Sequence, residues 1–293
     1  MHEELVEKIW PGREAQVSVL GGGITNHNLK VELDDGETFV LRIVGRDTAL
    51  LGIDRRVEYE ASLAAAAVGV GPEVGAYVES EGYLVTRFIE GEIVPPELMR
   101  EPATIRRVVA ALRPVHMGPP LPGRFDAFRV VEEYRSTAFA RGAAVPSEYV
   151  RARQIARTIE RARGPVPERP CHNDLLNANF IDDGTRIRIV DLEYAGMGDI
   201  FFDLANFAVN HDFDEEMRAE LLAAYFGSVR PADLRALEMM RFMSLYREAM
   251  WGVVQGAISE LDFDFAAYAE EHFARIAELT AEPAFDAALV GAS

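Results

Sequence analysis

The chain has 293 residues, a length that suits one two-lobed domain or two compact ones. Hydrophobic residues make up 49% of it and charged residues 27%, an ordinary balance for a globular protein, and no apolar run approaches the roughly 20 residues that span a bilayer. The formal net charge of −18 disfavours nucleic acid and anionic lipid as partners and favours a small cationic ligand.

The cysteine content and the N-terminal sequence indicate where in the cell the protein is expected. The only cysteine, Cys171, rules out an internal disulfide and suits a reducing compartment, and the acidic N-terminus lacks the basic start and apolar block of a secretion signal. We therefore expect a cytoplasmic protein without membrane insertion, either a monomer or a homodimer. Lysine occurs only at Lys8 and Lys30, so arginine must supply most of the cationic groups.

Residues 1–90 are expected to form a small N-terminal lobe, a helix followed mostly by strands. Residues 29–33 and 38–44 are β-rich and flank an Asp-Asp-Gly turn, which predicts a hairpin. An alanine-rich segment at 55–68 predicts one helix, and two more strands are expected at 73–78 and 83–89.

Residues 91–293 are expected to form a larger helical lobe. The pattern predicts helices at 102–116, 125–140, 147–163, 215–226, 231–258 and 263–279. A short β island at 179–181 and 187–192 interrupts them around a second Asp-Asp-Gly turn. The predicted fold class is therefore α+β and bilobal.

The most informative segment is Cys-His-Asn-Asp-Leu-Leu-Asn-Ala-Asn, which begins at Cys171. Its polar core is His172, Asp174 and Asn179, and Asp191 follows twelve residues later, after the second strand of the island. Phosphoryl transfer needs a carboxylate to orient a hydroxyl and oxygen ligands to hold Mg²⁺. Any one of these residues alone would fit a turn or a cap, but the set on a loop and hairpin predicts a phosphotransferase site.

Two N-terminal features could serve phosphate groups. The glycines Gly22 and Gly23, with Thr25 and Asn26 after them, can bring backbone and side-chain donors close to phosphate oxygens, although such a run also fits an ordinary turn, and no Walker-type lysine follows. Arg42 alternates with apolar neighbours on its strand, so it should face the cleft, where Glu58 or Glu60 could pair with it.

Taken in order, these motifs resemble the choline/ethanolamine kinase family, which belongs with the aminoglycoside phosphotransferases in the protein-kinase-like superfamily. The matching segments are Gly-Gly-Ile-Thr-Asn at 22–26, Leu-Arg-Ile at 41–43, His-Asn-Asp-Leu at 172–175 and Asp-Leu-Glu-Tyr-Ala at 191–195. The resemblance covers residues from about 20 to about 280 and implies the bilobal protein-kinase-like fold. A protein kinase would show a DFG segment and a later APE motif, and neither is present.

The resemblance also implies roles for individual residues. ATP and Mg²⁺ would be the cofactors, Asp174 the catalytic base with His172 beside it, and Arg42 the phosphate-binding cation paired with Glu58. Metal ligands would be Asn179 and Asp191, with Glu193 nearby. Residues 86–89 would receive adenine through backbone groups, which adds Arg87, Phe88 and Ile89 to the nucleotide site.

The acceptor would be a small cationic amino alcohol, choline first and ethanolamine second. A quaternary ammonium is best held by aromatic faces and nearby carboxylates, and the C-terminal helices offer both. Trp251 and Tyr268 are the expected walls, with Asp212, Glu248 and Asn210 as further substrate contacts. Glu248 stands where choline kinases often have a second tryptophan, and Asn210 near where the family has a carboxylate, so ethanolamine or another amino alcohol stays open.

Two alternatives remain at this stage. One is a phosphotransferase for a different hydroxyl compound, such as thiamine, an aminoglycoside, a sugar or an amino acid. The other is a pseudokinase-like module that binds nucleotide or a cation without turnover. The presence of Asp174, Asn179 and Asp191 together argues against the second.

Overall fold

A five-stranded antiparallel sheet forms most of the N-terminal part of the chain. The computed structural model describes residues 2–21 and 26–290. The strands lie in the order β1-β2-β3-β5-β4 and follow the short helix α1 (His2–Ile9). Their bounds are Ala15–Leu20 for β1, Asn26–Leu33 for β2, Thr38–Val44 for β3, Val74–Val78 for β4 and Tyr83–Arg87 for β5.

Apolar and polar side chains alternate along β2 and β3, and the apolar ones form a small core in the N-terminal part. Leu29, Val31 and Leu33 of β2 point to one face and are buried together with Phe39 and Leu41 of β3. Side chains of α1 cover this apolar face. The opposite face of β3 carries Arg42.

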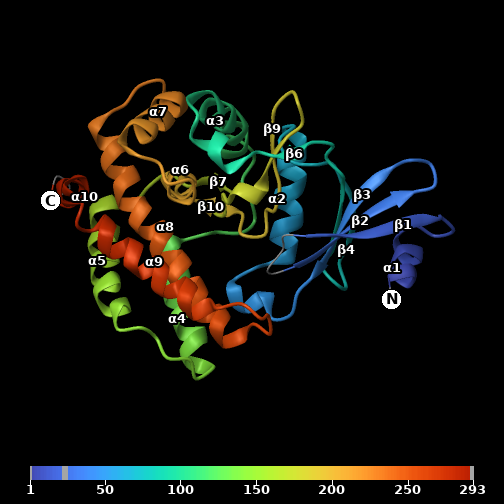
Figure 1. The fold of residues 1–293 in the computed structure, drawn as a ribbon, viewed down its shortest axis with the longest axis horizontal. Helices are drawn as coiled ribbons and strands as arrows, with labels where there is room; N and C mark the ends of the chain where they lie inside the picture. The colour runs from blue at the N-terminus through green and yellow to red at the C-terminus, as the bar shows by residue number, and fades with distance from the viewer. Residues whose placement is uncertain (1, 22–25, 291–293) are drawn as a thin grey trace.

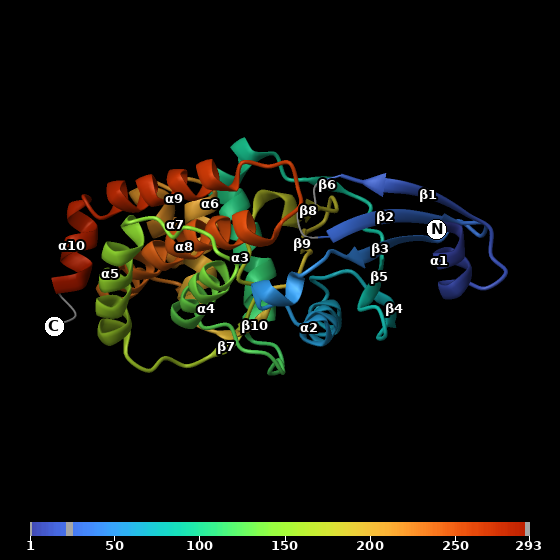
Figure 2. The ribbon, with the colours of Figure 1, turned by 90° about the horizontal axis from the view of Figure 1, so that it is seen from below.

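Helix α2 (Arg55–Ala67) lies between the sheet and the helical part (Figures 1 and 2). Asp54 caps its N-terminus by accepting from the backbone N–H of Arg56 at 2.9 Å. Ala61 and Ala65 on one side of the helix pack against Leu192 of the larger part. These small side chains let α2 lie close to the helical part of the chain. The helix thereby brings Glu58 to the boundary between the sheet and the helical part.

The rest of the chain is mainly helical. Figure 1 shows these helices gathered on the side of the molecule away from the sheet. Their bounds are Pro102–His116 for α3, Ala127–Ala140 for α4, Glu148–Arg163 for α5, Ile200–Asn210 for α6, Glu215–Phe226 for α7, Pro231–Ile258 for α8, Phe265–Leu279 for α9 and Pro283–Val290 for α10.

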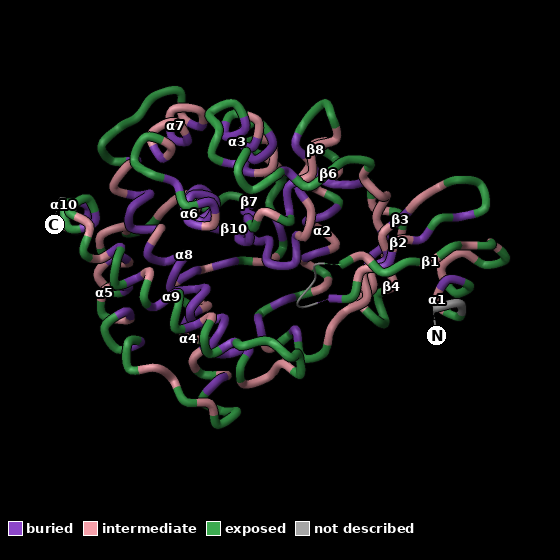
Figure 3. The backbone as a smooth tube through the Cα atoms, viewed as in Figure 1, coloured by how far each residue is buried: buried purple, intermediate pink, exposed green. Residues whose placement is uncertain are grey.

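Helix α8 is the centre of this part, packed against α4, α6, α9 and α10. Figure 3 shows buried residues concentrated along α6 and α8. No helix in the described ranges combines the length and apolarity needed to cross a membrane.

Short strands and 3₁₀ turns connect the two parts and carry the motif segments. β6 (Glu92–Ile93) pairs with β8 (Phe180–Asp182), which pairs with β9 (Ile187–Ile189), while β7 (Arg169–Cys171) pairs with β10 (Gly196–Gly198). The 3₁₀ turns are Thr48–Leu51, Pro96–Arg100 and Asn177–Asn179. The loop 172–179 therefore begins at one small sheet and ends at the other.

The α+β, two-part architecture expected from the sequence is confirmed. The helices predicted at 102–116, 215–226 and 231–258 have the observed bounds, and most other elements agree to within two or three residues. Strands β1, β6, β7 and β10 and helices α6 and α10 were not predicted. Helix α6 reads Ile-Phe-Phe-Asp-Leu-Ala-Asn-Phe-Ala-Val-Asn and is buried nearly all round, so it shows no polar face by which to recognise it.

Replacing Phe180 tests the contribution of the buried core beside the loop 172–179 to stability. The ring is fully buried and packs against Phe207 and His211, so Phe180→Ala should cost about 3–5 kcal/mol of unfolding free energy through the cavity it leaves. Urea denaturation measures this cost. Phe139→Ala, at a ring that is 70% exposed, is the control and should stay within about 0.5 kcal/mol of the parent. Equal effects of the two changes would contradict the assigned core.

Candidate active site

The carboxylate of Asp203 on α6 anchors the loop 172–179. Its Oδ2 accepts a hydrogen bond from the backbone N–H of His172 at 2.7 Å, and its Oδ1 accepts one from the N–H of Asn173 at 2.6 Å. Nε2 of His116 lies 2.9 Å from the same Oδ2. Burial disfavours the charged carboxylate, but these neighbours outweigh it and the pKa of Asp203 is lowered.

Asn206, one turn along the same face of α6, adds a second anchor. Its side-chain oxygen accepts from the N–H of Leu175 at 2.6 Å, and its Nδ2 donates to Ser244 at 3.0 Å. The loop is thus held through its backbone, which leaves the side chain of Asp174 available for chemistry.

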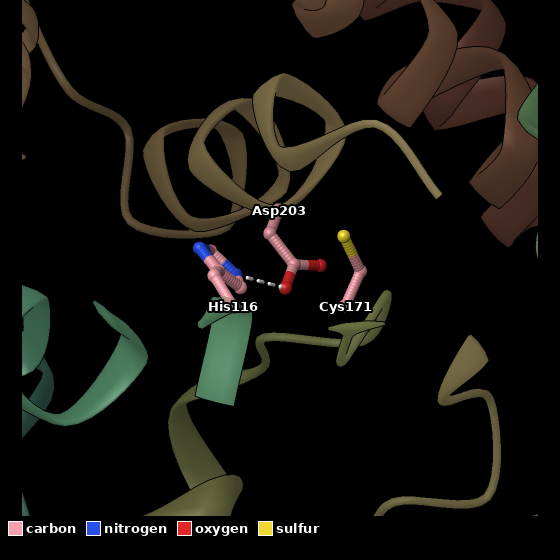
Figure 4. Close-up of side chains that lie close together, drawn as sticks. All are labelled: His116, Cys171 and Asp203. Atoms are coloured by element: carbon pink, nitrogen blue, oxygen red, sulfur yellow. Dashed lines mark hydrogen bonds and ion pairs between the residues drawn. The ribbon is translucent and has the colours of Figure 1, made fainter. Parts of the chain in front are cut away.

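His116, Cys171 and Asp203 lie close together beneath this loop (Figure 4). Their potential ligand atoms all lie within 4.8 Å of one another. Both oxygens of Asp203 already accept N–H donors, however, and burial raises the pKa of the Cys171 thiol, which keeps it protonated. We therefore assign this trio to loop support and not to a metal.

The backbone of the loop is held in a sharp turn. Asn173 has a φ of 67°, a left-handed conformation that asparagine tolerates, and its Nδ2 donates to the carbonyl of Tyr194 at 3.0 Å. Nδ1 of His172 accepts from the N–H of Asp174 at 3.2 Å, while its Nε2 lies 2.9 Å from the Val190 carbonyl. Burial lowers the pKa of His172, so a neutral imidazole joins the loop to the segment before Asp191.

Asp174 and Asn179 are linked within the same turn. Nδ2 of Asn179 donates to the backbone carbonyl of Asp174 at 2.8 Å. Burial, reinforced by the charges of Glu248 and Asp191 and opposed by Arg247, raises the pKa of Asp174 to about 7. A carboxylate with this pKa can accept a proton near neutral pH.

Arg42 joins the sheet to the hairpin across the cleft. Its Nη1 lies 2.6 Å from Oε1 of Glu58 and 2.6 Å from Oδ1 of Asp191. Burial works against the charged guanidinium, but the surrounding carboxylates outweigh it and the pKa of Arg42 is raised. The structure therefore selects Glu58 as the partner of Arg42, whereas Glu60 pairs with Arg56 on the surface.

Asp191 has a left-handed backbone with a φ of 67°, an unusual conformation that functional sites often contain. It turns the chain away from β9 so that the carboxylate faces Arg42. Oxygen atoms from Asn179 and Asp191 form the donor set that Mg²⁺ prefers. In the described part of the chain the side-chain oxygen of Asn179 and Oδ2 of Asp191 accept no hydrogen bond, so these two residues fit a bound Mg²⁺.

Glu193 and Asn26 contact each other close to this group. Nδ2 of Asn26 donates to Oε2 of Glu193 at 2.8 Å, and Arg55 bridges Glu193 and Glu58 through its Nη1. The roles predicted for Glu193 at the metal and for Asn26 at phosphate remain predictions. Gly22, Gly23 and Thr25 lie outside the described residues.

A cleft of about 300 Å³ opens between the sheet and the β8–β9 hairpin. Arg42 and Asp191 line one end of it, and Thr86, Arg87, Phe88 and Ile89 line the other; further lining residues include Leu20, Val40, Leu84, Ile181 and Val190. The N–H of Phe88 donates to the carbonyl of Thr38 at 2.9 Å, and the side chain of Arg87 bonds Glu37.

The predicted aromatic walls meet on α8 and α9. Trp251 and Tyr268 stand edge to face with ring centroids 5.5 Å apart, and the Tyr268 hydroxyl donates to Oε2 of Glu248 at 2.9 Å. Nη1 of Arg247 contacts Glu248 and, at 3.1 Å, Oδ1 of Asp174. The structure thus brings Trp251, Tyr268 and Glu248 to the same place as Asp174.

The other two predicted substrate residues lie apart from the aromatic pair. Nδ2 of Asn210 donates to the carbonyl of Leu175 at 3.3 Å, so it supports the loop 172–179 from α6. The Asp212 side chain is 73% exposed and pairs with Arg275 at 3.0 Å. Neither has a contact with Trp251 or Tyr268 among the described residues.

Sequence reasoning missed Arg247, Arg55 and Asp203. A signal was present for Asp203, the one charged residue of the apolar segment that forms α6, which indicates a buried and paired charge. Arg247 has no such signal, because Glu248 stands directly beside it. Arg55 carries no comparable local signal, since an arginine in the first turn of a helix is ordinary.

Comparison with known proteins agrees with a phosphotransferase site. A family model described as "Phosphotransferase enzyme family" matches residues 16–239. A solved structure of a choline/ethanolamine kinase family protein from Mesorhizobium loti is 32% identical, with a TM-score of 0.85 over 99% of this chain and 98% of that one.

Two more distant relatives extend the comparison. Ethanolamine kinase 2 of Homo sapiens is 27% identical over 299 residues, covering 90% of this chain and 76% of the human protein. The choline kinase LicA of Streptococcus pneumoniae shares the fold at 20% identity, with a TM-score of 0.81 over 96% of this chain and 98% of that one.

Asp203→Asn tests the anchor of the loop. The neutral side chain replaces a buried charged acceptor of N–H groups, so unfolding free energy should fall by about 3 kcal/mol in urea denaturation. Asp286→Asn, an exposed aspartate on α10, is the matched control and should change it by less than about 0.5 kcal/mol. A loss at Asp203 no larger than the control's would show that the loop does not depend on this carboxylate.

Proposed function

Because the chain belongs to the phosphotransferase enzyme family, and within it to the choline/ethanolamine kinase family, we propose that it transfers the γ-phosphate of ATP to the hydroxyl of a small amino alcohol. One observation carries the proposal: Asp174 is joined through Arg247 to Glu248 of the aromatic, acidic group that contains Trp251, and it also feels the charge of Asp191, which lines the cleft with Arg42.

The nucleotide belongs in the cleft of about 300 Å³. Its apolar walls suit adenine, and the backbone of residues 86–89 offers hydrogen-bonding groups at the far end. The Phe88 N–H is already used, so we assign adenine to the Phe88 carbonyl and the Ile89 N–H. Arg42 is then placed to bind phosphate oxygens, since a guanidinium matches their geometry.

Asn179 and Asp191 would hold Mg²⁺, which neutralises charge on the phosphate oxygens when bound. The side-chain oxygen of Asn179 and Oδ2 of Asp191 accept no hydrogen bond from another described residue, while Oδ1 of Asp191 contacts Arg42. Glu193 would act close by, with its charge balanced by Arg55.

Asp174 orients the acceptor hydroxyl and takes its proton. The hydroxyl oxygen forms a bond to the γ-phosphorus while the bond from that phosphorus to the bridging oxygen of ADP breaks, so the products are a phosphomonoester and ADP. His172 holds the Asp174 backbone in place without facing the cleft, because it is 1% exposed. His172 is therefore a positioning residue.

The amino group of the acceptor is assigned to the group formed by Trp251, Tyr268 and Glu248. Aromatic faces and a carboxylate together bind a cation, and the acidic character of the chain attracts one. A panel of choline, ethanolamine, thiamine, kanamycin, a sugar and a hydroxy amino acid, followed by ADP release, separates this acceptor class from the alternatives.

Asp174→Asn tests the base. Turnover should fall by about 10²- to 10⁴-fold because the amide cannot accept the proton, while ATP binding measured by calorimetry stays within about twofold. Asp286→Asn provides the matched control, since its exposed side chain lies on α10. Full turnover in Asp174→Asn would remove Asp174 from the mechanism, and no turnover of any alcohol by the parent protein would favour a binding module.

Asp191→Asn tests the metal site. One carboxylate ligand is replaced by an amide, so the Mg²⁺ concentration for half-maximal activity should rise by about tenfold or more, with lower maximal activity. Titration of ADP release with Mg²⁺ at saturating ATP gives the curve. An unchanged curve would place the metal elsewhere.

A further inference from the structure

Arg247 of α8 places a permanent cation inside the proposed acceptor group. Its side chain is 2% exposed, and its Nη1 contacts both Asp174, at 3.1 Å, and Glu248. Its guanidinium carbon lies 4.4 Å from the centroid of the Tyr194 ring, within the range of a cation–π contact. A cation thus already stands where the base, a second carboxylate and an aromatic face come together.

The remaining aromatic surface is limited. The Tyr194 hydroxyl accepts from Nε1 of Trp251 at 3.0 Å, so the Tyr194 ring belongs to the same group as Trp251 and Tyr268. Arg247 covers the Tyr194 face. A ligand cation would be left with Trp251, Tyr268 and the carboxylate of Glu248.

The charge of the group still favours one more cation. Asp174 and Glu248 share the single guanidinium of Arg247. A monocationic acceptor would give the second carboxylate a cationic partner of its own.

The chemistry of the cation then matters. A primary ammonium has N–H donors for carboxylate oxygens, whereas a quaternary ammonium has none and depends on aromatic faces around its methyl groups. With the Tyr194 face covered by Arg247, the group offers more to the first kind of cation than to the second.

We propose that Arg247 is a specificity-determining residue that covers one aromatic face of the acceptor site and so restricts the acceptor to primary amino alcohols of the ethanolamine type, excluding choline. The inference rests on the proposed function, because it concerns the acceptor of that reaction. From the sequence alone choline comes before ethanolamine as the acceptor, and this inference reverses that order.

Binding can be measured without turnover, because the chain has only two tryptophans, Trp10 and Trp251. Trp10 packs on Phe39 in the sheet, so a Trp10→Phe background leaves Trp251 as the single reporter at the acceptor group. Fluorescence titration with ethanolamine and with choline gives the two dissociation constants. In this background ethanolamine should bind at least about tenfold more tightly than choline.

Arg247→Ala in the same background should reduce this preference by about tenfold or more, because it uncovers the Tyr194 face. Arg235→Ala is the matched control, about 18 Å away along the same helix from the rise of 1.5 Å per residue, and it should keep the parent preference. Thermal denaturation checks folding. Should Arg247→Ala fail to fold with two unpaired carboxylates, Arg247→Lys keeps a cation for them but removes the guanidinium plane from the ring, and it should also reduce the preference.

Several results would overturn the inference: equal binding of the two ligands by the Trp10→Phe protein, no binding of ethanolamine, or a preference left unchanged in a folded Arg247 variant. Turnover separates it from the proposed function. Selective binding of ethanolamine without ADP release from any alcohol and Mg²⁺–ATP would reject the phosphotransferase while supporting the role of Arg247. Phosphorylation of choline and ethanolamine with equal kcat/KM would support the phosphotransferase and reject the role of Arg247 in specificity.

Discussion

The Arg42 guanidinium lies 2.6 Å from carboxylate oxygens on both sides of the cleft, Glu58 of α2 and Asp191 after β9. The Glu58 carboxylate is buried and depends on cationic partners, so this contact helps to fix the sheet, α2 and the hairpin relative to one another. Arg55 repeats the pattern between Glu58 and Glu193. A triphosphate in the cleft would offer Arg42 a competing anionic partner, which makes this junction the natural place for phosphate.

Backbone anchoring holds the loop 172–179 without using the Asp174 side chain that is proposed for catalysis. Asp203 holds the loop 172–179 through amide groups, and left-handed conformations at Asn173 and Asp191 turn the chain so that side chains face the cleft. These conformations cost energy that the packed surroundings of α6 and α8 offset. The packed helices therefore hold this segment mainly through its backbone amides.

Sequence pattern predicted much of the fold, because the hairpins carry turn signals and several helices have a polar face, as at residues 102–116 and 148–163. It failed for α6, which is buried nearly all round. The spacing of Asp174, Asn179 and Asp191 predicted a set that the structure gathers beside the cleft. The contact between Arg247 and Asp174 could not be predicted, since the two residues lie 73 positions apart and only tertiary packing brings them together.

We propose that Asn179 and Asp191 hold a metal-bound triphosphate opposite Arg42. A crystal structure with Mn²⁺ and a non-hydrolysable ATP analogue tests it most directly, because manganese has an anomalous signal. We predict one anomalous peak at bonding distance, about 2.1–2.2 Å, from the side-chain oxygens of both residues, with Arg42 on the phosphates. A peak away from both residues, or a nucleotide bound outside the cleft, would contradict the account.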